Sequence, residues 1–299
     1  MNNIKTSFSI RDLEHLSGIK AHTIRIWEKR YGLLQPERTD TNIRTYGLAS
    51  LQKLLNIVYL YNDGYKISKI AKIDEAEIPA LVNEIQLSKN SDGHIINEFK
   101  LAMMNYDQAL FMNTYNTLLS NKDFHTIFYD IFIPLLNEMG LLWQTDTITP
   151  AQEHFITALI KQKIITNTEK FQQLEPFKTD KVFVLFLPEN EIHDIGLLFI
   201  NHEIIRRGYQ TIFLGPAVPL ENLAGLMEHF KNVYFISYFT LQPSMDKIEK
   251  YVHDFVRIGN NYNNPNLWIL GRQVQFLHKE RLPKTISVFT SIEQIVAEI

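Results

Sequence analysis

The rhythm of apolar and polar positions changes twice along the chain. Up to residue 73, apolar residues recur every three or four positions in short stretches, which predicts short helices. Residues 95–171 keep this period over four longer segments, which predicts a four-helix bundle. Beyond residue 180, continuous apolar runs alternate with helical stretches, as in a doubly wound parallel sheet. We therefore expect a multidomain protein.

The first stretch has local signals for a pair of helices. Ser9, followed three residues later by Asp12, resembles a capping box and predicts a helix start. A Gly-bearing turn then leads to a second helix over residues 21–31, in which Ile24 and Trp27 face inward. Two short helices joined in this way form a helix-turn-helix, whose second helix enters the major groove of DNA.

The polar, basic residues 37–46 are able to form a small β-wing, so the first domain is predicted to be a winged helix-turn-helix. Two further helices are expected over residues 48–61 and 67–73. Residues 89–93 contain Asn, Ser, Asp and Gly and form the expected flexible point. We place a DNA-binding domain at 1–75, a linker at 76–94, the helical bundle at 95–175 and the sheet domain at 180–299.

The C-terminal part is predicted to be a flavodoxin-like, Rossmann-like α/β domain. Its strands are expected at Val182–Leu187, Thr211–Leu214, Val233–Tyr238, Leu267–Leu270 and Ile286–Phe289. The helices between and after them are expected at Asp194–Arg207, Leu220–Phe230, Ser244–Ile258 and Ser291–Ile299. The ligand of such a sheet binds outside the carboxyl ends of the strands.

Charge separates the first domain from the rest of the chain. Residues 1–73 hold 12 Lys and Arg against 6 Asp and Glu, whereas the remaining residues hold 18 against 27. A basic module on an acidic body is typical of nucleic-acid binding, because phosphate neutralisation dominates such affinity. The sequence has no cysteine, which excludes disulfides and thiolate metal sites. No apolar run reaches the roughly 18 residues of a membrane span, so we expect a cytoplasmic protein without membrane contact.

One histidine follows the first predicted strand of the sheet domain. His193 stands between the carboxylates of Glu191 and Asp194, with Gly196 three residues further on. A carboxylate that accepts the Nδ1 proton leaves Nε2 able to ligate a metal. A lone loop histidine is more often a hydrogen-bonded surface residue, so the neighbouring motifs decide between the two interpretations.

The basic end resembles the winged-helix DNA-binding domain of MerR-type transcription regulators. The resemblance is carried by the run from Thr23 to Gly32, TIRIWEKRYG, and by the residues Leu34, Pro36, Arg38, Thr39, Asn42, Arg44 and Tyr46. It implies that Thr23, Arg25, Arg38, Arg44 and Tyr46 contact a double-stranded DNA operator, mostly through phosphates. It also implies a homo-oligomer, a dimer or a tetramer.

A bundle followed by a sheet with Glu191-x-His193-x-x-Gly196 resembles the cobalamin-binding unit of methionine synthase and its relatives. The resemblance implies that His193 is the lower ligand of cobalt and that the nucleotide tail is buried in the sheet domain. Ser237 and Gly271 stand at two further positions of the family pattern, and Leu214-Gly215-Pro216 matches it. Phe239 and Arg272 depart from that pattern and add bulk where the tail is expected.

A second match lies in the bundle, where nine residues separate Trp143 from Glu153-His154. This spacing and the Glu-x-His-x-x-Gly variant resemble the light-responsive, cobalamin-dependent MerR-type repressors of the CarH and LitR type. In that group these side chains cover the upper face of the corrin. The resemblance implies that Trp143, Glu153 and His154 bind the cofactor, with adenosylcobalamin as its form.

We therefore expect a DNA-binding transcription regulator, a repressor, whose oligomerisation and operator binding are controlled by adenosylcobalamin and by light. The alternative is a MerR-type regulator whose C-terminal half is a cofactor-free dimerisation or partner-binding module, which Phe239 and Arg272 would allow. An enzyme, such as a corrinoid methyl carrier or a mutase subunit, is not expected, because residues 1–75 do not suit a methyl carrier and no substrate barrel accompanies the sheet.

Overall fold

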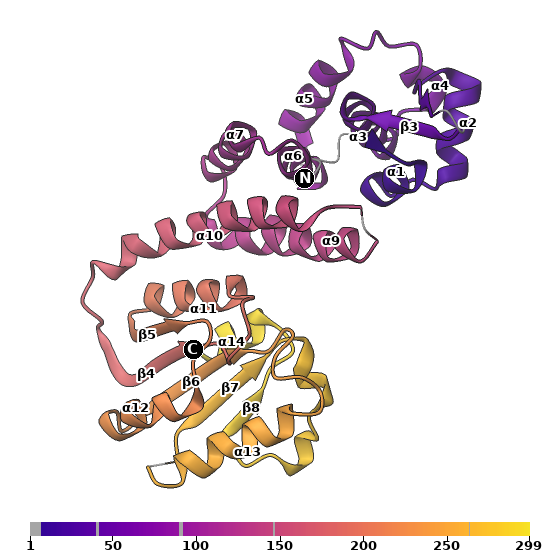
Figure 1. Ribbon diagram of the computed structural model, residues 1–299. Coiled ribbons are helices and arrows are strands. Elements are labelled where there is room, and N and C mark those ends of the chain that lie inside the picture. The colour runs from indigo at the N-terminus through magenta and orange to yellow at the C-terminus, as the bar shows by residue number, and fades with distance from the viewer. Residues whose placement is uncertain (1–6, 40–41, 90–91, 146, 263) are drawn as a thin grey trace. The chain divides into compact units, whose positions relative to one another are not determined.

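The computed structural model describes residues 7–39, 42–89, 92–145, 147–262 and 264–299. The chain divides into two compact units, Met1–Leu159 and Ile160–Ile299 (Figure 1). The first unit is mainly helical, and the second is built on a parallel sheet. The domain boundaries that we place at residues 75, 94 and 175 stay predictions. Residues 90 and 91 of the expected flexible point lie outside the described residues.

The first two helices are α1 (Ile10–Ser17) and α2 (Ala21–Tyr31), as predicted. Ser9 Oγ accepts the N–H of Asp12 at 3.2 Å, and the Asp12 carboxylate accepts the N–H of Ser9 at 2.7 Å. This is the predicted capping box, which satisfies two backbone donors at the helix start. Gly18 ends α1 at φ 74°, a left-handed conformation that glycine adopts without strain.

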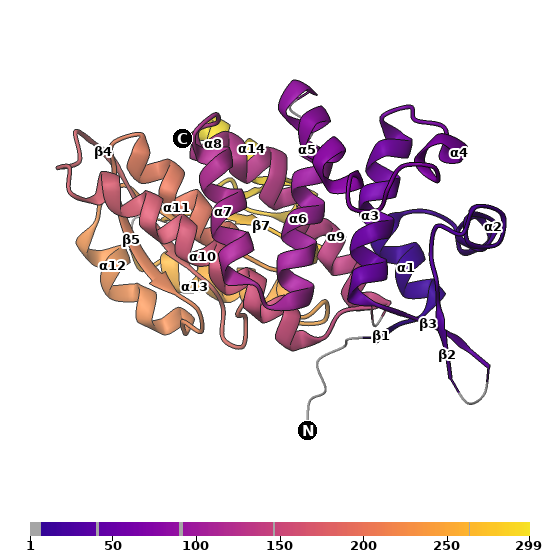
Figure 2. The same cartoon turned by 90° about the horizontal axis from the view of Figure 1, so that it is seen from above.

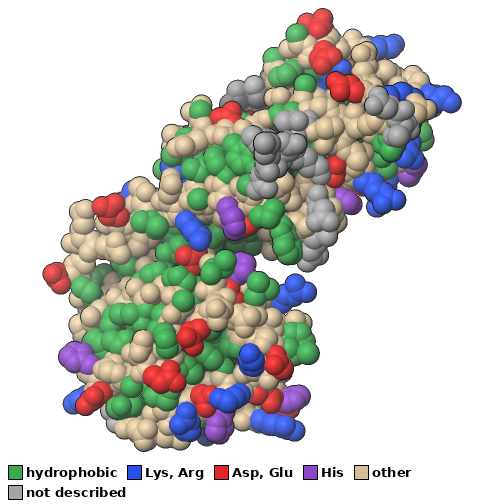
Figure 3. Space-filling model, viewed as in Figure 1, with side chains coloured by type: hydrophobic (Ala, Val, Ile, Leu, Met, Phe, Trp, Pro, Cys, Tyr) green, Lys and Arg blue, Asp and Glu red, His purple; other side chains and the backbone are tan. Residues whose placement is uncertain are grey.

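Three short antiparallel strands form a small sheet in the order β1-β3-β2. They are β1 (Ser7–Phe8), β2 (Glu37–Arg38) and β3 (Arg44–Gly47). Figure 2 shows β2 and β3 as a projecting hairpin, which is the predicted wing. On the face drawn in Figure 3, Lys and Arg side chains gather around the end of the first unit that carries α2. The positive balance of residues 1–73 is thus displayed beside the helix-turn-helix.

Three helices follow the wing: α3 (Leu48–Asn62), α4 (Ile67–Ile70) and α5 (Ile78–Lys89). α4 is shorter than predicted, because the backbone N–H groups of Lys72 and Ile73 bond to the carbonyls three residues back instead of the helical four. The predicted linker contains α5, which sequence reasoning missed. Its signal is the spacing of Ile78, Val82 and Ile85, which places three buried side chains on one helix face.

The bundle predicted over residues 95–171 is present within this helical part. Its elements are α6 (Asp92–Asn105), α7 (Gln108–Leu119), α8 (Phe124–Ile127), the π-helical turn η1 (Phe128–Phe132), α9 (Ile133–Gln144) and α10 (Pro150–Gln172). Aromatic rings fill the interior, where Phe99 lies 5.0 Å from Phe111 and 5.8 Å from Phe132 between ring centroids. The helical spacing of apolar residues over this range therefore corresponds to a packed apolar core.

The second unit holds a five-stranded parallel sheet in the order β5-β4-β6-β7-β8. The strands are β4 (Lys178–Phe186), β5 (Tyr209–Gly215), β6 (Val233–Tyr238), β7 (Asn266–Leu270) and β8 (Ile286–Val288). Residues 183–187 are fully buried, as expected of a central strand with both faces covered. The predicted fold class is confirmed.

Helices cover both faces of this sheet (Figure 1). α11 (Ile195–Arg206) and α14 (Ile292–Glu298) contact each other on one face. The other face carries η2 (Leu220–Leu223), α12 (Ala224–His229) and α13 (Ile248–Gly259), and two short 3₁₀ turns follow β7, η3 (Arg272–Phe276) and η4 (Lys279–Arg281). Because β5 and β6 lie on opposite sides of β4, the crossovers diverge between β4 and β6. The carboxyl edge at this switch point is where open parallel sheets bind their ligands.

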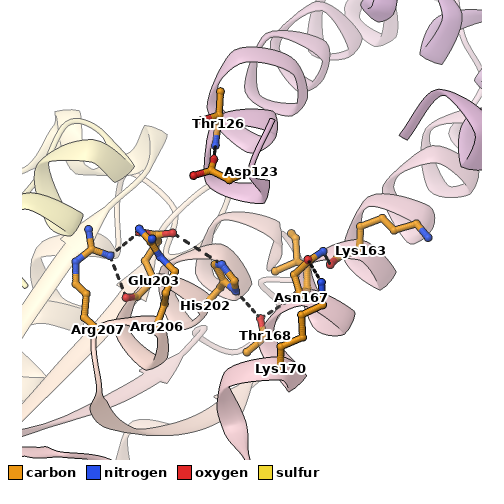
Figure 4. Close-up of polar contacts among 11 residues, drawn as sticks. Asp123, Thr126, Lys163, Asn167, Thr168, Lys170, His202, Glu203, Arg206 and Arg207 are labelled. Atoms are coloured by element: carbon orange, nitrogen blue, oxygen red, sulfur yellow. Dashed lines mark hydrogen bonds and ion pairs between the residues drawn. The ribbon is translucent and has the colours of Figure 1, made fainter. Parts of the chain in front are cut away.

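A buried carboxylate holds the end of α11 (Figure 4). Glu203 is fully buried, and its Oε2 accepts hydrogen bonds from Arg206 at 3.1 Å and from Arg207 at 2.5 Å. His202 Nε2 lies 3.9 Å from Glu203 Oε1, and His202 Nδ1 lies 3.2 Å from Thr168 Oγ1. The network thus connects α11 with the part of α10 in the same unit.

Candidate functional site

The loop after β4 presents one imidazole at the carboxyl edge of the sheet. The side chain of His193 is 44% exposed, whereas that of Glu191 is fully buried. Glu191 Oε1 lies 2.5 Å from His193 Nδ1 and also accepts the backbone N–H groups of Ile192 and His193, both at 3.0 Å. One carboxylate oxygen therefore fixes both the backbone and the ring of His193.

The second oxygen of Glu191 bonds to a different loop. Oε2 accepts the backbone N–H groups of Thr240, Leu241 and Gln242 at 3.2, 2.6 and 2.8 Å. These donors follow β6, on the other side of the switch point from the β4 loop. Sequence reasoning did not find them, because a backbone N–H group leaves no residue signature. Glu191 thus joins the loop after β4 to the loop after β6.

These contacts determine the charge and the tautomer of the pair. Burial on its own raises the pKa of Glu191, but hydrogen bonds from His193 and from the backbone N–H groups outweigh it and lower that pKa to about 2. An ionised carboxylate only accepts hydrogen bonds, so Nδ1 of His193 carries the proton of the neutral ring. Nε2 is then the nitrogen with the lone pair that a metal ion needs.

Asp194, the other carboxylate beside His193, takes no part in this arrangement. Its Oδ1 pairs with Lys161 of α10 at 2.5 Å. Of the two carboxylates noted in the sequence, one supports the imidazole and the other contacts a lysine of α10.

Two further residues of the family pattern serve packing within the protein. Ser237 is fully buried, and its Oγ donates to the backbone carbonyl of Phe186 at 2.9 Å. Gly271 has φ 110°, and a Cβ atom at this position would lie 2.5 Å from the carbonyl oxygen of Phe239. Glycine is required there because the two backbones meet directly. Cobalamin binding by Ser237 and Gly271 stays a prediction.

The bulky departures from the family pattern lie in two different environments. Phe239 is fully buried in the core between the sheet and α13, with its ring 5.5 Å from that of Tyr251. The side chain of Arg272 is exposed. The expectation that Phe239 and Arg272 add bulk where the tail binds stays a prediction. The ring of Tyr238, a third bulky side chain in this region, lies against the backbone of Gly196.

The three predicted upper-face residues belong to the first unit. Trp143 is 57% exposed near the end of α9, which is unusual for so large an apolar side chain. In the first turn of α10, Glu153 Oε2 lies 3.0 Å from His154 Nδ1, and the His154 side chain is 69% exposed. Both aromatic rings are accessible in this unit, as ligand-contacting groups must be.

The predicted DNA-contacting residues lie on α2 and the wing. Arg25 and Arg38 are exposed, and Thr23 and Arg44 are half-buried. Arg38 donates to Asn42 Oδ1 at 2.5 Å within the wing. An exposed guanidinium on the second helix and another on the wing suit contacts with phosphates along one groove.

Tyr46 differs from this prediction. Its side chain is 1% exposed, and its hydroxyl donates to Glu28 Oε2 at 2.9 Å. Glu28 Oε1 accepts from Arg44 Nε, also at 2.9 Å. The Tyr46 ring is therefore packed in the core at the base of the wing, and its contact with DNA stays a prediction. Glu28, which sequence reasoning missed, instead ties the wing to α2.

A hollow of about 370 Å³ lies elsewhere in the second unit. It is lined by the end of α10, residues 173–177, the end of α11 and the first residues of β5. These are the amino ends of the strands, whereas His193 follows the carboxyl end of β4. Ligands of open parallel sheets bind at the carboxyl ends, so the hollow is no part of the candidate site.

Two family patterns match this chain. Residues 8–77 match the MerR HTH family of regulatory proteins, and residues 95–166 match the B12 binding domain. The chain joins a MerR-type helix-turn-helix domain to a B12-binding domain. The resemblance drawn from the sequence motifs is confirmed, both for the DNA-binding front and for the helical part that precedes the sheet.

Curated relatives of this two-domain chain are regulators. The HTH-type transcriptional repressor CarH of Myxococcus xanthus is 26% identical over 223 residues, which are 73% of this chain and 73% of that protein. The HTH-type transcriptional repressor CarA of the same organism is 24% identical over 218 residues, 72% of this chain and 70% of that protein. These matches agree with the prediction of a regulator and not an enzyme.

A solved structure shares the architecture. The Methanosarcina barkeri monomethylamine corrinoid protein aligns with a TM-score of 0.58 at 15% identity, over 70% of this chain and 98% of that one. At this identity the likeness shows the fold, a helical part followed by a parallel sheet. Within the described residues, no helix has both the length and the apolar character needed to cross a membrane.

Proposed function

We propose that this protein is a transcriptional repressor whose assembly and operator affinity are controlled by adenosylcobalamin and by light. The observation that carries the proposal is the Glu191–His193 pair at the carboxyl edge of the sheet, in a chain that also holds a MerR-type DNA-binding domain. The two repressors of Myxococcus xanthus support it, because they match across most of both chains.

The donor set of the β4 loop fits an axial ligand of cobalt. His193 is accessible, its Nδ1 is occupied by Glu191, and its Nε2 has the lone pair. Bound adenosylcobalamin would supply the cobalt centre that His193 holds and a cobalt–carbon bond that light cleaves. The residues of this chain hold the imidazole in place and keep its tautomer constant, while Trp143 and His154 offer exposed rings for the upper face.

Contacts within the first unit connect its DNA-binding helices with the helices of the bundle. His15 Nδ1 of α1 lies 3.0 Å from Thr147 Oγ1, in the loop between α9 and α10. Buried Lys100 of α6 donates to the carbonyl of Leu16 in α1 at 3.3 Å and pairs with Glu138 of α9 at 2.5 Å. A ligand that shifts α9 or α10 therefore acts on α1 through polar contacts, and coupling of the two sites needs such a shared element.

The mass of the protein in solution tests the proposal. With adenosylcobalamin in the dark, light scattering should give a larger assembly than the cofactor-free chain, and green light should reverse the change. A ligand that binds the larger assembly more tightly than the smaller one stabilises the larger assembly. This difference in affinity is lost when the adenosyl group leaves. His193→Ala should bind without the spectral change of imidazole ligation. An unchanged mass in all three states of the wild type would sink the proposal.

Operator binding gives a second test through Arg25. On an operator selected by the protein from a random DNA pool, Arg25→Ala is expected to weaken binding about 5- to 150-fold, as loss of a contact worth about 1–3 kcal/mol predicts. Titrations at several salt concentrations distinguish a phosphate contact, whose loss lowers the salt slope by about 1, from a base contact. Arg257→Ala on α13 removes the same charge from the second unit and is the matched control. Equal affinities and salt slopes for Arg25→Ala and the wild type would contradict an Arg25 contact.

A further inference from the structure

An aromatic ring of β6 lies against the first turn of α11, beside the loop that carries His193. Tyr238 is the last residue of β6, and Gly196 lies in the first turn of α11, three residues after His193. A Cβ atom on Gly196 would lie 2.5 Å from Tyr238 Cε2 and 2.9 Å from Cδ2. The ring therefore rests directly on the glycine backbone, where no other residue type would leave it room.

Strand alternation places this ring on the α11 and α14 face of the sheet. Ser237, the preceding residue, points to the opposite side and bonds to Phe186. Burial raises the pKa of the Tyr238 hydroxyl, and the charge of Glu293 on α14 raises it further. Tyr238 thus lies between the sheet and two helices, beside the loop that carries His193.

This placement bears on how a corrinoid fits the domain. If His193 ligates the cobalt, the lower face of the macrocycle meets the carboxyl edge of the sheet. A group below that face is then expected to enter the sheet domain at the switch point. The nucleotide tail of cobalamin hangs from the lower face and ends in a bicyclic base. The Glu191–His193 loop fits the cobalt, whereas the space beside Gly196 is occupied by the Tyr238 ring.

We propose that Tyr238 is a specificity-determining residue that fills the space of the nucleotide base, so that this domain prefers a corrinoid whose tail lacks the bulky base. The proposal rests on the proposed function, because it assumes that His193 ligates cobalt. Displacing a packed ring disrupts its contacts with Gly196, while a corrinoid without the base leaves the ring in place. The ring thus discriminates by steric exclusion, the usual route to selectivity between ligands of shared chemistry.

The test compares hydroxocobalamin with diaquacobinamide, which share Co(III) and the macrocycle. They differ in the tail, whose base also ligates cobalt in free hydroxocobalamin, so the effect of Tyr238 is the change in the ratio of the two dissociation constants between the wild type and the variants. Dissociation constants are measured by absorbance for the full-length wild type, Tyr238→Ala and Tyr238→Phe. The wild type should bind the cobinamide about 10- to 200-fold more tightly than the cobalamin, as steric discrimination in a packed pocket allows. Tyr238→Ala should gain affinity for cobalamin and keep its affinity for cobinamide.

Two controls separate bulk from other effects. Tyr238→Phe keeps the ring and should discriminate like the wild type, and Tyr238→Leu replaces Tyr238→Ala if the smaller residue destabilises the fold. Equal affinity of the wild type for both corrinoids, or no gain of cobalamin affinity in either the Ala or the Leu variant, overturns the assignment of Tyr238 and leaves the proposed function standing. If neither corrinoid binds to the wild type or to any variant, both the proposed regulation by cobalamin and this inference are overturned.

Discussion

Replacing Glu191 with Ala is expected to weaken corrinoid binding about 10- to 100-fold, the usual effect of removing the partner that orients a metal-ligating histidine. Glu191 Oε1 lies 2.5 Å from Nδ1 of His193, and Oε2 accepts hydrogen bonds from the backbone N–H groups of residues 240–242. Without the carboxylate the imidazole loses its fixed tautomer, and the two loops lose their common acceptor. Absorbance titration with diaquacobinamide measures the change without interference from the tail.

Three further variants at this loop sharpen the result. Glu191→Asp keeps the charge but shortens the reach, so it should retain part of the affinity. Glu191→Gln keeps the length but brings an amide N–H₂ group towards backbone donors, which leaves part of the loop unsatisfied. Glu189→Ala removes an exposed carboxylate from the same loop and is the matched control. If Glu191→Ala and Glu189→Ala bind equally, the carboxylate has no orienting role.

The double substitution Arg206→Ala with Arg207→Ala is expected to lower the free energy of unfolding of the second unit by about 3 kcal/mol. It leaves the fully buried Glu203 without its two cationic partners, and breaking a buried ion pair from one side costs about 3–5 kcal/mol. The lower end of this energy range applies because the side chains of Arg206 and Arg207 are 36% and 27% exposed. Solvent therefore screens part of the interaction with Glu203.

Urea unfolding followed by the fluorescence of Trp268 measures this change in a chain whose Trp27 and Trp143 are replaced by Phe. Adding Glu203→Gln to the double variant removes the buried charge that has lost its two arginines and should restore part of the lost stability. Glu203→Gln alone should be less harmful than the double substitution, because it buries no charge. A triple variant that is less stable than the double variant would contradict a charge-based explanation.

Local sequence signals predicted the elements of this protein closely. The capping box at Ser9 and the inward spacing of Ile24 and Trp27 depend on residues a few positions apart, and both are present in the structure. The apolar runs of the sheet domain likewise predicted all five strands described in the second unit. The helix Ile78–Lys89 was missed because its polar, charged surroundings masked a buried stripe of three apolar residues.

Side-chain environments were predicted less well. Tyr46 matched a DNA-contacting position by motif, yet its ring is buried and its hydroxyl belongs to Glu28. Phe239 was expected to face the ligand, yet the chain leaves the strand after Tyr238 and turns Phe239 into the core of the opposite face. A motif records which residue stands at a position, whereas the face it occupies depends on where the strand ends.

The motif Glu191-x-His193-x-x-Gly196 could be read in the sequence together with its chemistry, because two residues at close spacing on one loop already imply an oriented imidazole. The three backbone donors of residues 240–242 and the Tyr238 ring against Gly196 are decided by the tertiary structure. The physical reason is that hydrogen bonds and steric contacts between the β4 and β6 loops exist once parallel pairing brings two distant strand ends to the same edge.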